Sequence, residues 1–199
     1  CAMVLSLGLG RYGLSLETLW RVFVGEAPLP QQELVYTLLW QVRLPRVLAA
    51  MLVGGALAMS GATYQGLFKN PMVSPDILGA SAGSGFGAAL AILNGWGFIG
   101  IQSAAFLCGL LAVGTTYLIS ILMGKGKSSV LLLVLTGMVI STLFAAFISM
   151  TKYVADPYSK LPAITFWLMG GLSSITMVDV KMVVWPLLTG GILLWCLRW

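Results

Sequence analysis

The sequence predicts an all-α integral membrane protein, built as a polytopic bundle of transmembrane helices. Hydrophobic residues make up 59% of the 199 residues and charged residues only 9%, whereas a soluble domain carries about 25% charged residues. Uncharged stretches cover residues 47–68 and 77–124, and about 20 apolar residues suffice to span the hydrocarbon core. These stretches are continuous rather than alternating, which excludes barrel strands. Backbone groups in lipid need internal partners, so the stretches are predicted to be helices.

The first complete span is expected over residues 47–68, directly after the motif Arg43-Leu-Pro-Arg46. Lys69-Asn70-Pro71 closes it, because proline disfavours helix at the residue before it. Ser74, Pro75 and Asp76 then suit an N-cap, a first helical position and the positive end of a helix dipole.

The uncharged stretch that follows is too long for one span, and Asn94-Gly95-Trp96-Gly97 divides it as a turn with an interfacial tryptophan. The second and third spans are therefore expected over residues 77–93 and 99–123. A fourth follows over 128–151. Residues 162–176 are expected to form short helical pieces at the interface, and a fifth span runs from Asp179 or Lys181 to Leu197.

Both ends of the chain suggest truncation. Residues 1–9 are apolar but too short to span, and residues 193–199 stop as a helix reaches an interface. The expectation is one transmembrane domain over residues 1–199, with five complete spans and the remnant of an earlier one.

Small residues recur four positions apart in the first two spans. Gly79, Gly83 and Gly87 form one row and Gly54, Ala58 and Ala62 another. Such a stripe lets neighbouring helix backbones approach closely, so these spans are expected at the centre of a tight bundle.

The composition excludes several classes of activity. There is no histidine, and Cys1, Cys108 and Cys196 are widely separated, so no metal site, cofactor site or His-based triad is predicted. The carboxylates all fall in loops or at helix ends, and no basic run suggests nucleic-acid binding. Without an ionisable group deep in a span, a proton-coupled mechanism is disfavoured. The chain is therefore not expected to be an enzyme.

The segment from Arg43 to Gly79, with Gly61, Gln65, Asn70-Pro71 and Ser74-Pro75 at their spacing, resembles the signature of the FecCD family. Residues 161–170, Leu-Pro-Ala-Ile-Thr-Phe-Trp-Leu-Met-Gly, also resemble the family, in particular its iron-chelate branch. The family comprises permease subunits of type II ABC importers for iron-siderophores, haem and cobalamin.

The resemblance implies a multi-pass protein of the bacterial inner membrane that translocates an iron chelate by alternating access. Its partners would be cytoplasmic ATP-binding subunits, where ATP is hydrolysed, a periplasmic substrate-binding protein and a second permease copy. Haem, cobalamin and molybdate remain alternative substrates. The alternative function is an ATP-independent channel or secondary carrier.

The resemblance also assigns roles and orientation. Arg43 and Arg46 would dock acidic residues of the binding protein from the periplasm, although they would equally suit a helix anchor at the headgroups. Ser128 and Ser129 would lie near the cytoplasmic gate, or form a helix N-cap. The translocation path or helix packing would involve Gly61, Gln65, Asn70, Pro71, Gly79, Gly83 and Gly87. The positive-inside rule, which expects most Lys and Arg on the cytoplasmic side, contradicts this orientation. The orientation puts four cations inside, Lys69, Lys125, Lys127 and Arg198. It puts seven outside, Arg11, Arg21, Arg43, Arg46, Lys152, Lys160 and Lys181.

Overall fold

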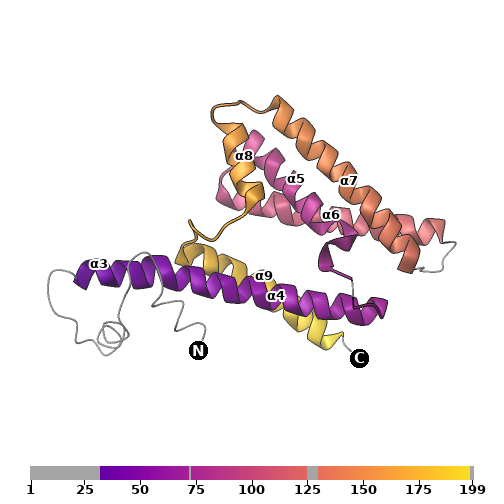
Figure 1. The fold of residues 1–199 in the computed structure, drawn as a ribbon, viewed down its shortest axis with the longest axis horizontal. Coiled ribbons are helices and arrows are strands. Elements are labelled where there is room, and N and C mark those ends of the chain that lie inside the picture. Colours follow the sequence, from indigo (N-terminus) through magenta and orange to yellow (C-terminus); the bar gives the residue numbers. More distant parts are fainter. Residues whose placement is uncertain (1–31, 72, 125–129, 198–199) are drawn as a thin grey trace. The chain divides into compact units, whose positions relative to one another are not determined.

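A computed structural model describes residues 32–71, 73–124 and 130–197, and these residues are helical with short connections (Figure 1). They fall into two compact units, described in turn. Unit 1 draws on the chain up to Met59 and from Gly171 onward, and unit 2 covers Ser60–Gly170. The all-α membrane fold predicted from composition is confirmed. Four described helices are long and apolar enough to cross a membrane.

The described part of unit 1 begins with an unbroken helical stretch, in which α3 (Gln32–Thr37) leads through the π-helical turn η1 (Leu38–Arg43) into α4 (Leu44–Phe68). The residues of α4 after Met59 belong to unit 2. Its apolar part, Val35–Phe68, is 34 residues long. The expected start at residue 47 was wrong, because Arg43-Leu-Pro-Arg46 lies inside the helix rather than before it.

Proline explains both the π turn and the wrong start. Pro45 has no N–H to give to the fourth residue before it, and its ring would crowd that carbonyl in a regular helix. The turn is widened instead, with the Leu44 N–H bonded to the Leu39 carbonyl five residues back, which is the π-helical pattern. The Pro45 side chain is fully buried. The proline is thus accommodated and does not end the helix.

The other long helix of unit 1 is α9 (Met177–Cys196). Thr176 and Asp179 form a capping box at its start, so α9 begins a few residues before the expected Asp179 or Lys181. Pro186 lies inside the helix, and the Thr189 hydroxyl donates to the Pro186 carbonyl at 3.0 Å.

Unit 2 contains the end of α4, the 3₁₀ turn η2 (Pro75–Leu78), α5 (Ala80–Leu93), α6 (Phe98–Met123), α7 (Val130–Val154) and α8 (Lys160–Met169). In Figure 1, α5 lies among α6, α7 and α8. Its alanines Ala88, Ala89 and Ala91 are almost fully buried. Ile164 of α8 is fully buried against the same end of α5.

The third and fourth spans agree with α6 and α7 within a few residues. Of the short helical pieces expected over residues 162–176, one is present as α8, whereas residues 170–176 are not helical. The second span was placed too early. Gly79, with φ of +82°, ends η2 in the left-handed region and separates it from α5. The 14 residues of α5 are about 21 Å long, less than the hydrocarbon thickness of about 30 Å.

Candidate functional site: the arginine edge and the glycine seam

Arg46 contacts the segment that precedes α9. Its Nη2 donates a hydrogen bond to the Ser173 carbonyl, 127 residues along the chain. Arg43, at the end of η1, is half-buried and also has an interaction partner. We call Arg43, Arg46 and residues 171–176 the arginine edge. Arg43 and Arg46 are the two arginines within residues 32–197 and lie three positions apart where η1 meets α4. The contact with residues 171–176 is made by the side chain of Arg46.

The segment 171–176 is fixed at its far end by the capping box of α9. The backbone N–H and the hydroxyl of Thr176 both donate to Asp179 Oδ2, each at 2.8 Å. The sequence interpretation missed Ser173, Thr176 and Asp179. The Thr-x-x-Asp spacing that identifies a capping box was present and could have revealed two of them.

The end of α4 carries Gln65, Asn70 and Pro71. Lys69 adopts φ of +49°, and the Asn70 N–H bonds the Gln65 carbonyl at 3.2 Å. The Gln65 side chain in turn donates to the Pro71 carbonyl at 3.2 Å. These contacts end the helix where the sequence predicted an end. Among the described atoms, nothing lies within 4 Å of where a Gly61 side chain would begin.

Gly79 lies in a crowded corner between η2 and α7. A Cβ placed on it would lie 3.1 Å from the Ser141 hydroxyl, and one on Gly137 would overlap the Ile77 carbonyl. The buried Thr116 hydroxyl of α6 donates to the Leu78 carbonyl at 3.1 Å. Asp76 Oδ1 accepts from the Ser81 N–H at 3.3 Å. The carboxylate thus satisfies an orphan N–H in the first turn of α5.

Gly83 and Gly87 form what we call the glycine seam, the line along which α5 contacts α6. A Cβ on Gly83 would lie 2.6 Å from the Cys108 carbonyl oxygen. One on Gly87 would overlap the Ala104 carbonyl and lie 2.8 Å from Cys108 Cβ. Ser128 and Ser129 lie outside the described residues.

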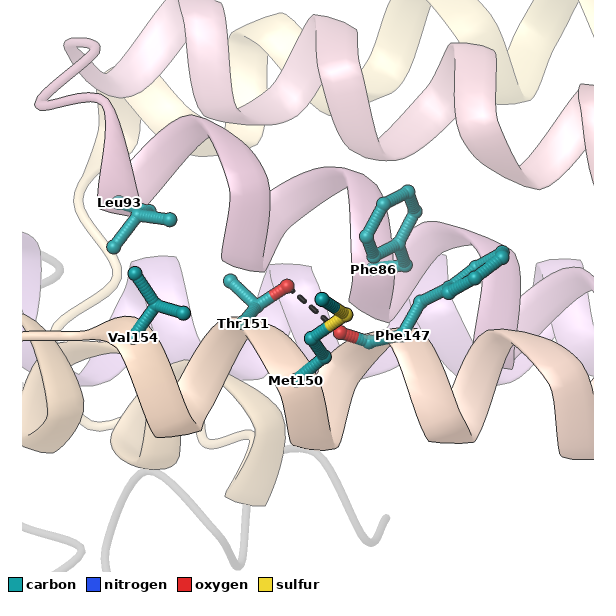
Figure 2. A pocket seen from close by; sticks show the side chains of 6 residues that line it. All are labelled: Phe86, Leu93, Phe147, Met150, Thr151 and Val154. Atoms are coloured by element: carbon teal, nitrogen blue, oxygen red, sulfur yellow. Dashed lines mark hydrogen bonds between the residues drawn. The ribbon is translucent and has the colours of Figure 1, made fainter.

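An apolar depression of about 230 Å³ lies between α5 and α7. Figure 2 shows the side chains of Phe86 and Leu93 facing those of Phe147, Met150, Thr151 and Val154 across it. The Thr151 hydroxyl is bonded to the Phe147 carbonyl at 2.8 Å, the dashed line in Figure 2. The lining therefore favours apolar contact, not recognition of a polar ligand. No group of three or more metal-ligating side chains occurs among the described residues.

Permease proteins of two known import systems are similar to this chain in sequence. The chain is 38% identical to a molybdate import system permease protein of Haemophilus influenzae over 98% of its own length and 58% of the relative. It is 36% identical to a vitamin B12 import system permease protein of Salmonella paratyphi A over 68% of its length and 41% of that relative. The chain thus spans little more than half of the molybdate permease.

A solved structure and a family match agree with these relatives. The solved structure is an inward-facing conformation of an ABC transporter described as metal-chelate type. It superposes with a TM-score of 0.82 and 36% identity, over 99% of this chain and 58% of that one. The family model of the FecCD transport family matches residues 1–199. With helix arrangement, sequence identity and family match in agreement, the chain belongs to the FecCD transport family.

Proposed function

We propose that the chain belongs to the membrane-spanning permease subunit of an ATP-driven importer, which moves a metal chelate inward by alternating access. The observation that carries this is the likeness to the metal-chelate type transporter, at 36% identity over 99% of the chain. The permease performs no covalent chemistry and opens its pathway to one side at a time. Substrate and nucleotide must bind the two states with different affinity for transport to follow.

The proposed partners supply the driving energy and the other half of the pathway. No charged side chain lies in the middle of the four described membrane-length helices, so these four helices carry no proton relay. ATP-binding subunits on the cytoplasmic side would provide the energy, and a second permease copy would complete the pathway in the bacterial inner membrane. Ser128 and Ser129 would contribute to the cytoplasmic gate.

A periplasmic binding protein would dock on the arginine edge. The planar guanidinium of arginine binds a carboxylate through two parallel hydrogen bonds, and complementary charge speeds the encounter. Exchanging Arg43 for Glu places like charges together, so we expect docking to weaken by tenfold or more. Binding of the purified binding protein to the permease in nanodiscs measures this. Unchanged affinity would remove Arg43 from the proposed site.

The proposed cargo is an iron-siderophore, supported by the resemblance of residues 161–170 to iron-chelate permeases. Molybdate is the main competitor, because the molybdate permease is 38% identical. Uptake of radiolabelled ferric siderophore, molybdate and vitamin B12 is compared in proteoliposomes holding the full-length permease, its ATP-binding subunits and its binding protein. We expect ATP-dependent uptake of the siderophore alone. Equal uptake with a hydrolysis-deficient ATPase would instead establish the channel or carrier.

A further inference from the structure

The bond between Arg46 and Ser173 joins a side chain to a backbone carbonyl. Because the acceptor is a backbone carbonyl, the bond does not depend on the side chain at position 173. Arg46 therefore fixes the path of the main chain rather than a particular side chain. A hydrogen bond from a charged donor is stronger than one between neutral groups, which suits this use on an exposed segment.

The segment is fixed in its middle by Arg46 and at its end by the capping box. The Ile175 N–H closes a turn onto the Leu172 carbonyl at 3.5 Å, and this turn encloses Ser173 and Ser174. Ser173, Ser174 and Thr176 are exposed. A short exposed segment held at two points is restrained, so less conformational entropy is lost when a partner binds it.

We infer that Arg46 is a positioning residue, which holds residues 171–176 in the one conformation that the binding protein recognises. This inference rests on the proposed function. The partner surface is acidic, because it would meet the cations of Arg43 and Arg46 together with the exposed segment that Arg46 holds. Arg46 has five N–H donors, so its bond to Ser173 leaves donors for a carboxylate of the partner. Its larger contribution is the shape of the segment.

The competing interpretation is that Arg46 contributes only its positive charge. Charge and shape can be separated, because Asp179 fixes the same segment with the opposite charge. Asp179→Ala removes a negative charge, which by charge alone would strengthen docking of an acidic partner or leave it unchanged. Through the segment, the same variant weakens docking. Thr176→Val alters the capping box without any change of charge and serves as the second variant.

The first measurement is amide hydrogen exchange of residues 171–176 in the full-length permease in nanodiscs, which needs no partner. We expect exchange to be faster in Arg46→Gln, in Asp179→Ala and in Thr176→Val. Lys181→Gln is the matched control, since it removes one exposed cation of α9 without touching the segment. Unchanged exchange in Arg46→Gln would overturn the inference, whatever the transporter carries.

The second measurement is ATPase activity of the reconstituted transporter against the concentration of binding protein. We expect the half-saturating concentration to rise about three- to tenfold in Arg46→Gln and Asp179→Ala, the range of one exposed hydrogen bond or cap, with an unchanged maximal rate. Arg46→Lys, which keeps a donor and the charge, recovers part of the affinity. Tighter or unchanged docking in Asp179→Ala would overturn the inference and leave the importer function standing. Absence of any stimulation in the unaltered transporter would instead refute the proposed function.

Discussion

Gly87 and Gly114 show how differently two glycines of neighbouring helices are used. A methyl group on Gly87 of α5 would overlap the backbone of α6, whereas nothing among the described atoms lies within 4 Å of one on Gly114 of α6. Hydropathy treats the two positions alike. The four-residue spacing of Gly83 and Gly87 did indicate close helix approach, but Gly79 at the head of the same row serves a left-handed turn.

Replacing Gly87 by Ala is expected to destabilise the protein by about 1–3 kcal/mol, because the added methyl group forces α5 and α6 apart. Gly114→Ala is expected to be neutral or to stabilise by up to about 1 kcal/mol, because alanine favours helix. Thermal unfolding of both variants in the same detergent measures the difference. Equal stabilities would show that the glycine seam tolerates a side chain.

Asp156, in the turn between α7 and α8, has a pKa held below its ordinary value. The Ser159 hydroxyl and the Ser159 N–H both donate to Asp156 Oδ2 at 2.7 Å, and these bonds favour the charged carboxylate. A lowered folded-state pKa contributes stability above the ordinary value of 3.8, and this is lost as pH falls through the folded-state pKa.

The midpoint of the pH-dependent shift of the Ser159 amide signal is therefore expected below 3.8, the ordinary aspartate value. Nuclear magnetic resonance of the permease in nanodiscs follows this signal through an acid titration. In Asp156→Asn the shift should disappear. A transition at or above the ordinary value would mean that the Ser159 bonds do not form in solution.

Helix lengths show where sequence patterns are reliable at the scale of the element. The expected spans at 99–123 and 128–151 lie close to α6 and α7, because charged or glycine-rich turns bound both. The start of α4 was misjudged because Pro45, just after the π turn, reads like a helix boundary. The start of α5 was misjudged because Ile77 and Leu78 are apolar although they belong to η2. Neither error is visible to hydropathy, which carries no information about backbone angles.

The apolar helix Val35–Phe68 is about 51 Å long, well beyond the hydrocarbon thickness of about 30 Å. If Phe68 lies at one membrane surface, the π turn and Arg43 lie outside the other. Single cysteines replacing Tyr36 and Leu57 in a cysteine-free background test this. Tyr36→Cys should react with a membrane-impermeant maleimide and Leu57→Cys should not.

Adding the maleimide to intact cells also determines orientation. Labelling of Tyr36→Cys from outside supports the family topology, and labelling only after lysis supports the cation count. Reaction of Leu57→Cys at the rate of Tyr36→Cys would contradict the placement of α4 in the bilayer.

At the scale of the whole molecule, the family could be recognised from sequence because its signature combines motif and spacing over residues 43–79. The contacts of the arginine edge could not, since Arg46 and Ser173 are 127 residues apart and no local pattern relates them. Substrate and partners stay predictions, because no described residue carries a motif specific to one chelate. The roles of Ser128 and Ser129 also stay predictions.

The short length of α5 has a consequence for where water reaches. Its Asn94 end carries the interfacial Trp96, and Lys160 Nζ lies 3.2 Å from where a Gly95 side chain would begin, which suits the headgroup level. With that end at the surface, Ala80 ends roughly 9 Å short of the opposite one. Non-helical backbone at such depth persists only inside protein or beside water. Protein covers part of this backbone, since Leu78 and Gly79 are buried and Thr116 bonds the Leu78 carbonyl. Asp76 and Ser81 are exposed instead, so water would reach these two positions from the near side of the bilayer. Ser81→Cys should accordingly react with a hydrophilic thiol reagent, and Leu111→Cys in mid-α6 should stay unreactive.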